Sequence, residues 1–177
     1  MALAKAPVSS TQTTYTNFVK TSCNVTTYPS VCLNSLLPYA TAIKSDPFRL
    51  VKQALSATLK SASTTRSTIS KLAKAKNITK GDAAVLKDCI QDIQDSISDI
   101  KDSLKALSSL KSSADKKFVL ANAQTWTSAA ITDEYSCTDG IDDEEVSPAV
   151  MKKIKSSIMS VARLSSNALY LINHLQV

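Results

Sequence analysis

Residues 86–107 read LKDCIQDIQDSISDIKDSLKAL, and this stretch decides the fold. Its large apolar side chains recur at alternating spacings of four and three residues. This repeat is typical of a long helix that packs against other helices at a shallow crossing angle. It predicts a helix from Asp82 to about Ser109. The apolar positions are Leu86, Ile90, Ile93, Ile97, Ile100, Leu104 and Leu107.

Aspartates repeat along the same predicted helix, each two residues after an apolar position. Two residues correspond to about 200° around a helix axis, so these carboxylates are predicted to lie on the outward face. Such a strip is either a solvated surface or an acidic docking surface for a partner, and the pattern alone allows both. The strip consists of Asp88, Asp92, Asp95, Asp99 and Asp102.

Three other segments carry helical apolar patterns. One begins at Asp46, an N-cap before Pro47, and runs to about Lys76; another begins at Ser147 and Pro148 and continues through Leu175. The third runs from about residue 113 to 132. The chain has only 2 glycines and 5 prolines and lacks strand-type alternation. We therefore predict an all-α fold, in which residues 46–177 form an antiparallel four-helix bundle.

The segment 113–132 is the least regular of the four. Trp126 is the single tryptophan of the chain. We predict that it fills the bundle core, with ligand stacking as the alternative. The positions predicted to face the core are Phe118, Ala121, Thr125, Trp126, Ala129 and Ala130.

The region before the bundle reads as shorter helical pieces. Residues 15–45 are predicted to form a helical hairpin, with Pro29 starting its second helix and Pro38 ending it. Residues 1–14 are predicted to be disordered. Residues 15–177 then form a single domain.

The four cysteines, Cys23, Cys32, Cys89 and Cys137, are not grouped as metal ligands are, and His174 is the single histidine. Disulfides are favoured over free thiols, although three pairings remain open. Disulfides indicate an oxidising compartment, and the N-x-T triplets at Asn24 and Asn77 agree with it. The start of the chain, MALAKAPVSSTQTT, shows no export signal, so we expect a processed or engineered form. No apolar run approaches the ~18 residues of a membrane span.

Catalytic chemistry is not predicted. The many hydroxyl side chains lack a neighbouring base, since His174 lies at the end of the chain, and there is no glycine-rich phosphate loop. The acidic segment CTDGIDDEEVSP, residues 137–148, is expected to join the third and fourth bundle helices. Its spacing is not that of a calcium loop, and its charges favour the start of the following helix. We expect no metal and no cofactor.

Charge is unevenly distributed. Residues 1–81 hold eleven basic residues and one acidic residue, a net charge of +10, whereas residues 82–145 hold six basic and fourteen acidic residues, a net charge of −8. The basic part has few aromatic residues for base stacking, so nucleic-acid binding is not expected. It is compatible with binding a polyanionic polysaccharide such as pectin.

Three motifs together resemble the plant invertase and pectin methylesterase inhibitor family, over nearly the whole chain from about Tyr15. They are CNVTTYPSVC at 23–32, LKDCIQDIQDSISDI at 86–100 and QTWTSAAITDEYSCTDG at 124–140. The resemblance implies that Cys23 pairs with Cys32 and Cys89 with Cys137. The third motif is similar to the pectin methylesterase inhibitor branch. Of the Pro-Lys-Phe motif of invertase inhibitors only Lys117 and Phe118 are present, after Lys116.

The resemblance implies a secreted plant inhibitor of the cell wall, or apoplast, that is not an enzyme and is monomeric when free. It implies a non-covalent one-to-one complex in which the bundle covers the pectin-binding cleft of a pectin methylesterase. Carried over by position, the contact residues are Gln91, Asp95, Ser98 and Ser136. Because Asp95 also belongs to the aspartate strip, we predict that Asp92 and Asp99 contribute to docking on the enzyme. The alternatives are an acid invertase inhibitor and a pectin-binding module.

Overall fold

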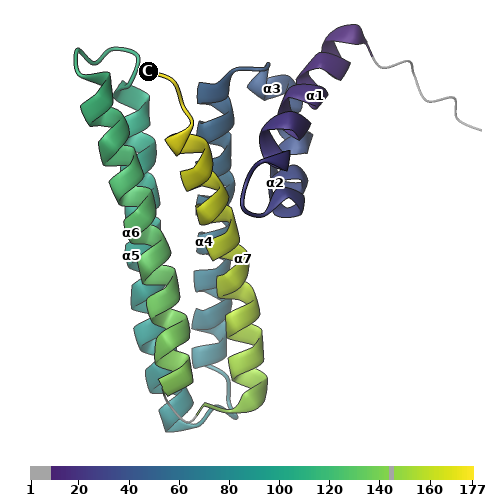
Figure 1. Ribbon diagram of the computed structural model, residues 1–177. Helices are drawn as coiled ribbons and strands as arrows, with labels where there is room; N and C mark the ends of the chain where they lie inside the picture. Colours follow the sequence, from purple (N-terminus) through teal and green to yellow (C-terminus); the bar gives the residue numbers. More distant parts are fainter. Residues whose placement is uncertain (1–8, 144–145) are drawn as a thin grey trace, which may run out of the picture.

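The computed structural model describes residues 9–143 and 146–177, and in this part of the chain the regular elements are helices. Four long helices run alternately up and down and pack as an antiparallel bundle (Figure 1). The sequence prediction of an all-α bundle is confirmed. No helix in the described ranges is long and apolar enough to cross a membrane. The bundle helices are α4 (Pro47–Ala73), α5 (Lys80–Ser109), α6 (Lys116–Asp143) and α7 (Pro148–Asn173).

The N-terminal hairpin lies beside the upper ends of α4 and α7 (Figure 1). Its first helix begins at Ser10 because the hydroxyl of Ser9 accepts a hydrogen bond from the Gln12 N–H at 3.2 Å. The prediction of disorder is therefore wrong for residues 10–14, while residues 1–8 lie outside the described residues. The elements are α1 (Ser10–Asn24), α2 (Pro29–Leu36), the 3₁₀ turn η1 (Leu37–Tyr39) and α3 (Ala40–Ile43).

Two disulfides brace the fold with the pairing that the family resemblance implied. Cys23 and Cys32 join α1 to α2, with Cα atoms 5.4 Å apart. Cys89 and Cys137 join α5 to α6, with Cα atoms 4.5 Å apart. The hairpin is also held to α7, because Asn167 exchanges two hydrogen bonds of 2.9 Å with the backbone of Tyr28.

The core lies where the apolar repeats of α4, α5 and α7 meet. On α5, Ile90 and Leu104 are half-buried, and the other five predicted apolar positions are buried. The apolar positions of α4 and α7 are likewise turned inward, as shown by Leu55, Ile69, Ile158 and Ile172, which are fully buried. Three of the four bundle helices thus follow the predicted pattern.

Helix α6 differs from its prediction in length and in orientation. It continues to Asp143, so Cys137 lies within the helix and most of the acidic segment is helical. Trp126 is 40% exposed, Phe118 is 62% exposed, and Ala121 and Thr125 are exposed as well, so the prediction that these four residues face the core is wrong. Ala129 is half-buried, and Ala130 is buried as predicted.

Large apolar side chains are buried near the two ends of α6, at Val119, Leu120 and Ile141, whereas the buried positions between them are small or polar and let α6 pack closely against α5. These intervening positions include Ala123, Thr127, Ala130, Glu134 and Cys137.

Candidate functional site

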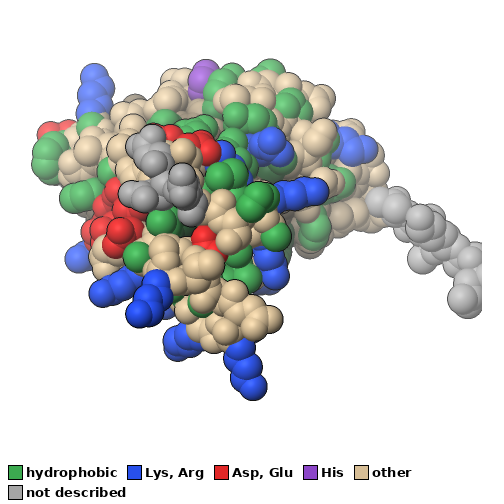
Figure 2. All heavy atoms as spheres, turned by 90° about the horizontal axis from the view of Figure 1, so that it is seen from below, with side chains coloured by type: hydrophobic (Ala, Val, Ile, Leu, Met, Phe, Trp, Pro, Cys, Tyr) green, Lys and Arg blue, Asp and Glu red, His purple; other side chains and the backbone are tan. Residues whose placement is uncertain are grey.

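The outward faces of α5 and α6 form an acidic surface, which we define as the five aspartates of the strip together with Asp133 of α6. Seen from the lower end of the bundle, acidic side chains gather on the side where α5 and α6 lie (Figure 2). Asp88, Asp95 and Asp102 are exposed, whereas Asp92 and Asp99 are half-buried. The prediction that the strip faces outward is confirmed.

Asp133 brings a sixth carboxyl to this surface from α6. Burial raises the pKa of Asp133 to about 6, and the neighbouring carboxyl of Asp99 adds to the effect. Burial likewise raises the pKa of Asp99 and of Asp92 above the usual range. A cation placed against these carboxyls would favour their ionised form and lower all three pKa values.

The acidic surface lacks internal counter-ions. Within residues 9–142 and 146–177, the ion pairs join Asp46 to Arg49 and Asp142 to Lys155, and neither pair involves this surface. The uncompensated negative charge makes the surface suited to a partner that presents lysine or arginine side chains.

The residues carried over from the family lie on this surface. Gln91 donates a hydrogen bond from Nε2 to Oδ1 of Asp95 at 2.9 Å, and Ser98 is exposed further along the same strip of α5. Ser136 is exposed on α6, where its hydroxyl donates to the Thr132 carbonyl at 3.0 Å. The structure therefore groups Gln91, Asp95 and Ser98 on one helix face and adds Ser136 from the neighbouring helix.

A hollow of about 360 Å³ lies between α5 and α6 beside the Cys89–Cys137 disulfide. Small residues, among them Gly81 and Gly140, leave this space open, and Asp88, Asp92 and Ser136 also line it. A Cβ atom added at Gly140 would meet nothing within 4 Å. The hollow has the chemistry to receive a basic side chain from a partner.

Asp133 and the hollow are the parts of the site that sequence reasoning missed. The predicted third helix ended at Thr132, one residue before Asp133. A helical period continued to Asp143 places Asp133 and Ser136 on one face, three residues apart. That extension is the signal that would have added Asp133 to the site beside Ser136.

No metal centre accompanies this surface in the described ranges, where no group of three or more His, Cys, Asp or Glu side chains is arranged to hold an ion. The exposed hydroxyls of Ser98 and Ser136 donate to helix carbonyls, those of Gln94 and Thr132. What the surface offers is charge and shape.

A family model described as "Plant invertase/pectin methylesterase inhibitor" matches residues 17–171. The chain belongs to this family. It is a family of inhibitors, so the chain is not an enzyme.

Two similar proteins of Arabidopsis thaliana illustrate the relation. Pectinesterase inhibitor 4 is 40% identical over 162 residues, which are 90% of this chain and 81% of the relative. Pectinesterase inhibitor 10 is 38% identical over 169 residues, which are 93% of this chain and 54% of the relative. This chain thus spans about half the length of the latter.

The fold also matches a solved structure. A crystal structure of a mutant form of a pectin methylesterase inhibitor from Arabidopsis superposes with a TM-score of 0.70. The superposition covers 89% of this chain and 97% of that one, at 18% sequence identity. At 18% identity, this superposition is evidence of a shared fold and of nothing more.

Proposed function

We propose that the protein inhibits a pectin methylesterase by forming a non-covalent one-to-one complex that covers the enzyme's pectin-binding cleft. The observation that carries the proposal is the coincidence, on α5 and α6, of the family's contact positions with an acidic surface that lacks counter-ions. Relatives of this chain bear the name pectinesterase inhibitor.

The proposed complex is held by complementary charge and by shape. Asp92, Asp95 and Asp99 pair with basic groups of the enzyme, and a side chain of the enzyme enters the hollow beside the Cys89–Cys137 disulfide. Because the half-buried carboxyls of Asp92 and Asp99 are already partly desolvated, pairing them with cations costs less further dehydration than pairing fully hydrated groups. Exclusion of the polymer from the cleft then blocks the reaction without any chemistry on the inhibitor.

Charge reversal at Asp95 tests the docking surface. Asp95→Lys is expected to weaken inhibition of pectin methylesterase by at least about tenfold, because it places like charges against each other across the interface. The helix content measured by circular dichroism should not change, since Asp95 is exposed. The inhibition constant is the quantity to measure.

Asp142→Lys is the matched control for this change. It alters the net charge equally, but the side chain of Asp142 is paired with Lys155 of α7 and lies outside the acidic surface. It should leave inhibition within about twofold of the unmodified protein. Equal inhibition by the Asp95→Lys protein and the unmodified one removes Asp95 from the interface.

Two changes at Gly140 separate stability from docking at the hollow. Gly140→Ala is expected to raise the free energy of unfolding by about 0.5–1 kcal/mol, because alanine favours the helix and the added Cβ meets no atom. Gly140→Phe fills the hollow and is expected to reduce inhibition without unfolding the protein. Thermal melting and inhibition assays of both proteins check this, and full inhibition by Gly140→Phe means that the hollow stays empty in the complex.

Inhibition of acid invertase is the second candidate function, because the family description includes both targets. The incomplete Pro-Lys-Phe motif at Lys117 and Phe118 favours the esterase. Assays of pectin methylesterase and of acid invertase with equimolar protein decide between them: inhibition of invertase alone overturns the first proposal.

The cellular setting follows as part of the proposal. We propose that the protein acts outside the cytosol, in the cell wall or apoplast, and that it is a monomer when free; the two disulfides support an oxidising compartment. Asn24 and Asn77 of the two N-x-T triplets are both exposed, so we propose both as glycosylation sites.

A further inference from the structure

Two adjoining hollows lie at the end of the bundle that carries the turn between α5 and α6. They share Phe48 and Lys111, and their volumes are about 360 Å³ and 140 Å³. Together they form a shallow groove, which we call the cationic groove. Its basic side chains are Arg49 and Lys52 from α4, Lys111 from the turn and Lys116 from α6.

The ring of Phe48 gathers two of these cations. The Nζ atoms of Lys111 and Lys52 lie 4.9 Å and 5.6 Å from the ring centroid, within the range of a cation–π contact. Among the described residues, no acidic side chain lines the groove. In the described part of the chain, Lys52, Lys111 and Lys116 form no ion pair.

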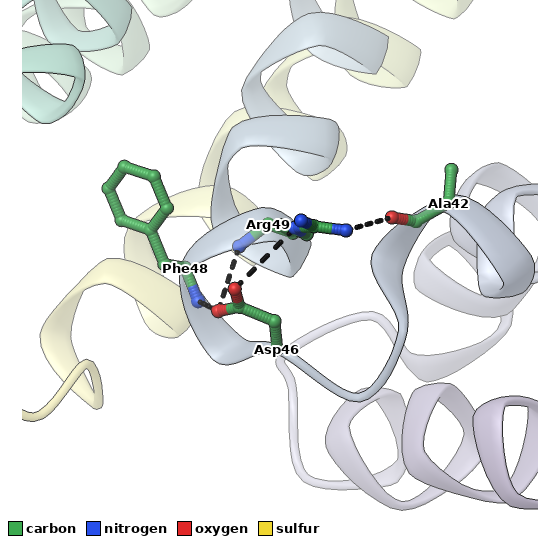
Figure 3. A network of polar contacts seen from close by, with 4 residues as sticks. All are labelled: Ala42, Asp46, Phe48 and Arg49. Carbon is green, nitrogen blue, oxygen red and sulfur yellow. Dashed lines mark hydrogen bonds and ion pairs between the residues drawn. The ribbon is translucent and has the colours of Figure 1, made fainter.

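Arg49 is held in place at one side of the groove. Its Nη1 donates to the carbonyl of Ala42 at 3.4 Å, and its Nε lies 3.6 Å from Oδ2 of Asp46 (Figure 3). Asp46 also caps α4 by accepting the N–H of Phe48 at 2.9 Å. A guanidinium fixed in this way loses little conformational entropy when it binds an anion.

We propose that the cationic groove binds a polyuronide, that is, an acidic polysaccharide with free carboxylates. The groove is open and spans two hollows, so it fits an extended chain better than a small ion, and its four cations outnumber the one carboxylate beside it. Apolar side chains such as Leu110 and Leu175 line it as well and suit the C–H faces of sugars. The choice of a uronide over other polyanions rests on the proposed function, since hydrolysis of pectin methyl esters produces uronate carboxylates.

The groove is separate from the acidic surface. Lys111 follows Asp102, the member of the α5 strip nearest to it in sequence, by nine residues, which is about 14 Å at the rise of a helix. The protein can therefore hold a polyuronide at one end of the bundle while α5 and α6 contact the enzyme. This arrangement keeps the inhibitor on pectin that has already lost methyl groups, where the enzyme has acted.

Binding of oligogalacturonate, measured by isothermal titration calorimetry, tests this inference. The paired change Lys52→Glu and Lys111→Glu is expected to weaken binding at least about tenfold. The control pair Lys152→Glu and Lys153→Glu, exposed on α7, makes the same change in net charge and should weaken binding less than about twofold. Equal losses in both proteins overturn the proposal, because binding would then follow net charge alone.

Three further measurements complete the test. Fully methyl-esterified oligomers should bind at least about tenfold more weakly than oligogalacturonate, and equal binding overturns the proposal. Dextran sulfate of matched length should bind more weakly than oligogalacturonate; tighter binding to the same groove overturns the choice of a uronide.

The Lys52→Glu and Lys111→Glu protein should still inhibit pectin methylesterase. If the unmodified protein inhibits no esterase, the proposed function fails, and oligogalacturonate binding still decides whether the groove is a polyuronide site.

Discussion

Removing the Cys89–Cys137 disulfide by the paired change Cys89→Ala and Cys137→Ala is expected to lower the free energy of unfolding by about 4 kcal/mol. The bridge spans 48 residues, so it restricts the unfolded chain strongly. For a protein of this size, the melting temperature should fall by about 8–16 °C. Thermal melting followed by circular dichroism measures the change.

The hairpin disulfide provides the comparison. Cys23 and Cys32 are separated by only 9 residues, so the change Cys23→Ala and Cys32→Ala is expected to cost about 3 kcal/mol or less. The order of the two losses follows from the loop lengths alone. A hairpin pair that costs more than the α5–α6 pair contradicts the loop argument.

Large apolar side chains made three helices of the bundle predictable. On α5, Ile93, Ile97 and Ile100 recur at spacings that only a helix brings to one face, and they are buried as expected. The large apolar residues of α4 and α7 are buried in the same way. Where a helix buries isoleucine and leucine, the spacing of these residues in the sequence predicts which face is buried.

Helix α6 was mispredicted because the middle of its buried face, between Leu120 and Ile141, is built from small and polar residues. Ala123 and Ala130 let the helix approach α5 closely, and Thr127 is buried beside Ser103, with their hydroxyls 2.8 Å apart. The hydrophobicity pattern finds Ala130 but misses Ala123 and Thr127, and it assigns the exposed Trp126 to the core. The close approach is a tertiary property that no local pattern contains.

The acidic surface was predictable only in part, for a related reason. The strip on α5 follows from spacing within one helix, and its outward direction is confirmed. The contact between Asp99 and Asp133 depends on how α5 and α6 lie against each other, which is a matter of register between helices. Sequence spacing fixes positions on one helix and leaves that register open.

Glu134 is the clearest case of a residue that the sequence pattern does not single out. Its side chain is fully buried between helices, where Oε1 accepts hydrogen bonds from Ser96 of α5 at 2.9 Å and from Ser165 of α7 at 2.7 Å. Oε2 has no hydrogen-bond partner. Burial raises the pKa of Glu134 to about 7, and the two serine hydrogen bonds oppose this rise only in part.

Replacing Glu134 with glutamine is therefore expected to stabilise the protein above neutral pH. The pKa of Glu134 is about 7 in the folded protein against an ordinary value of 4.5, so the folded state holds the proton more tightly than the unfolded state does. Stability is lost as the pH rises from about 4.5 to about 7. That loss amounts to roughly 3 kcal/mol at about 1.4 kcal/mol per pKa unit, and Glu134→Gln removes it.

The measurement is the free energy of unfolding in urea, for both proteins, at pH 4 and pH 8. The variant should exceed the unmodified protein by roughly 3 kcal/mol at pH 8 and match it near pH 4, since glutamine resembles the protonated side chain. Asp133 has a raised pKa and changes stability in the same direction, but it is present in both proteins, so only its repulsion from Glu134 enters the difference. A difference that does not grow with pH shows that Glu134 is ionised in the folded protein at the same pH as in the unfolded chain. Such a result contradicts its burial as a neutral acid between Ser96 and Ser165.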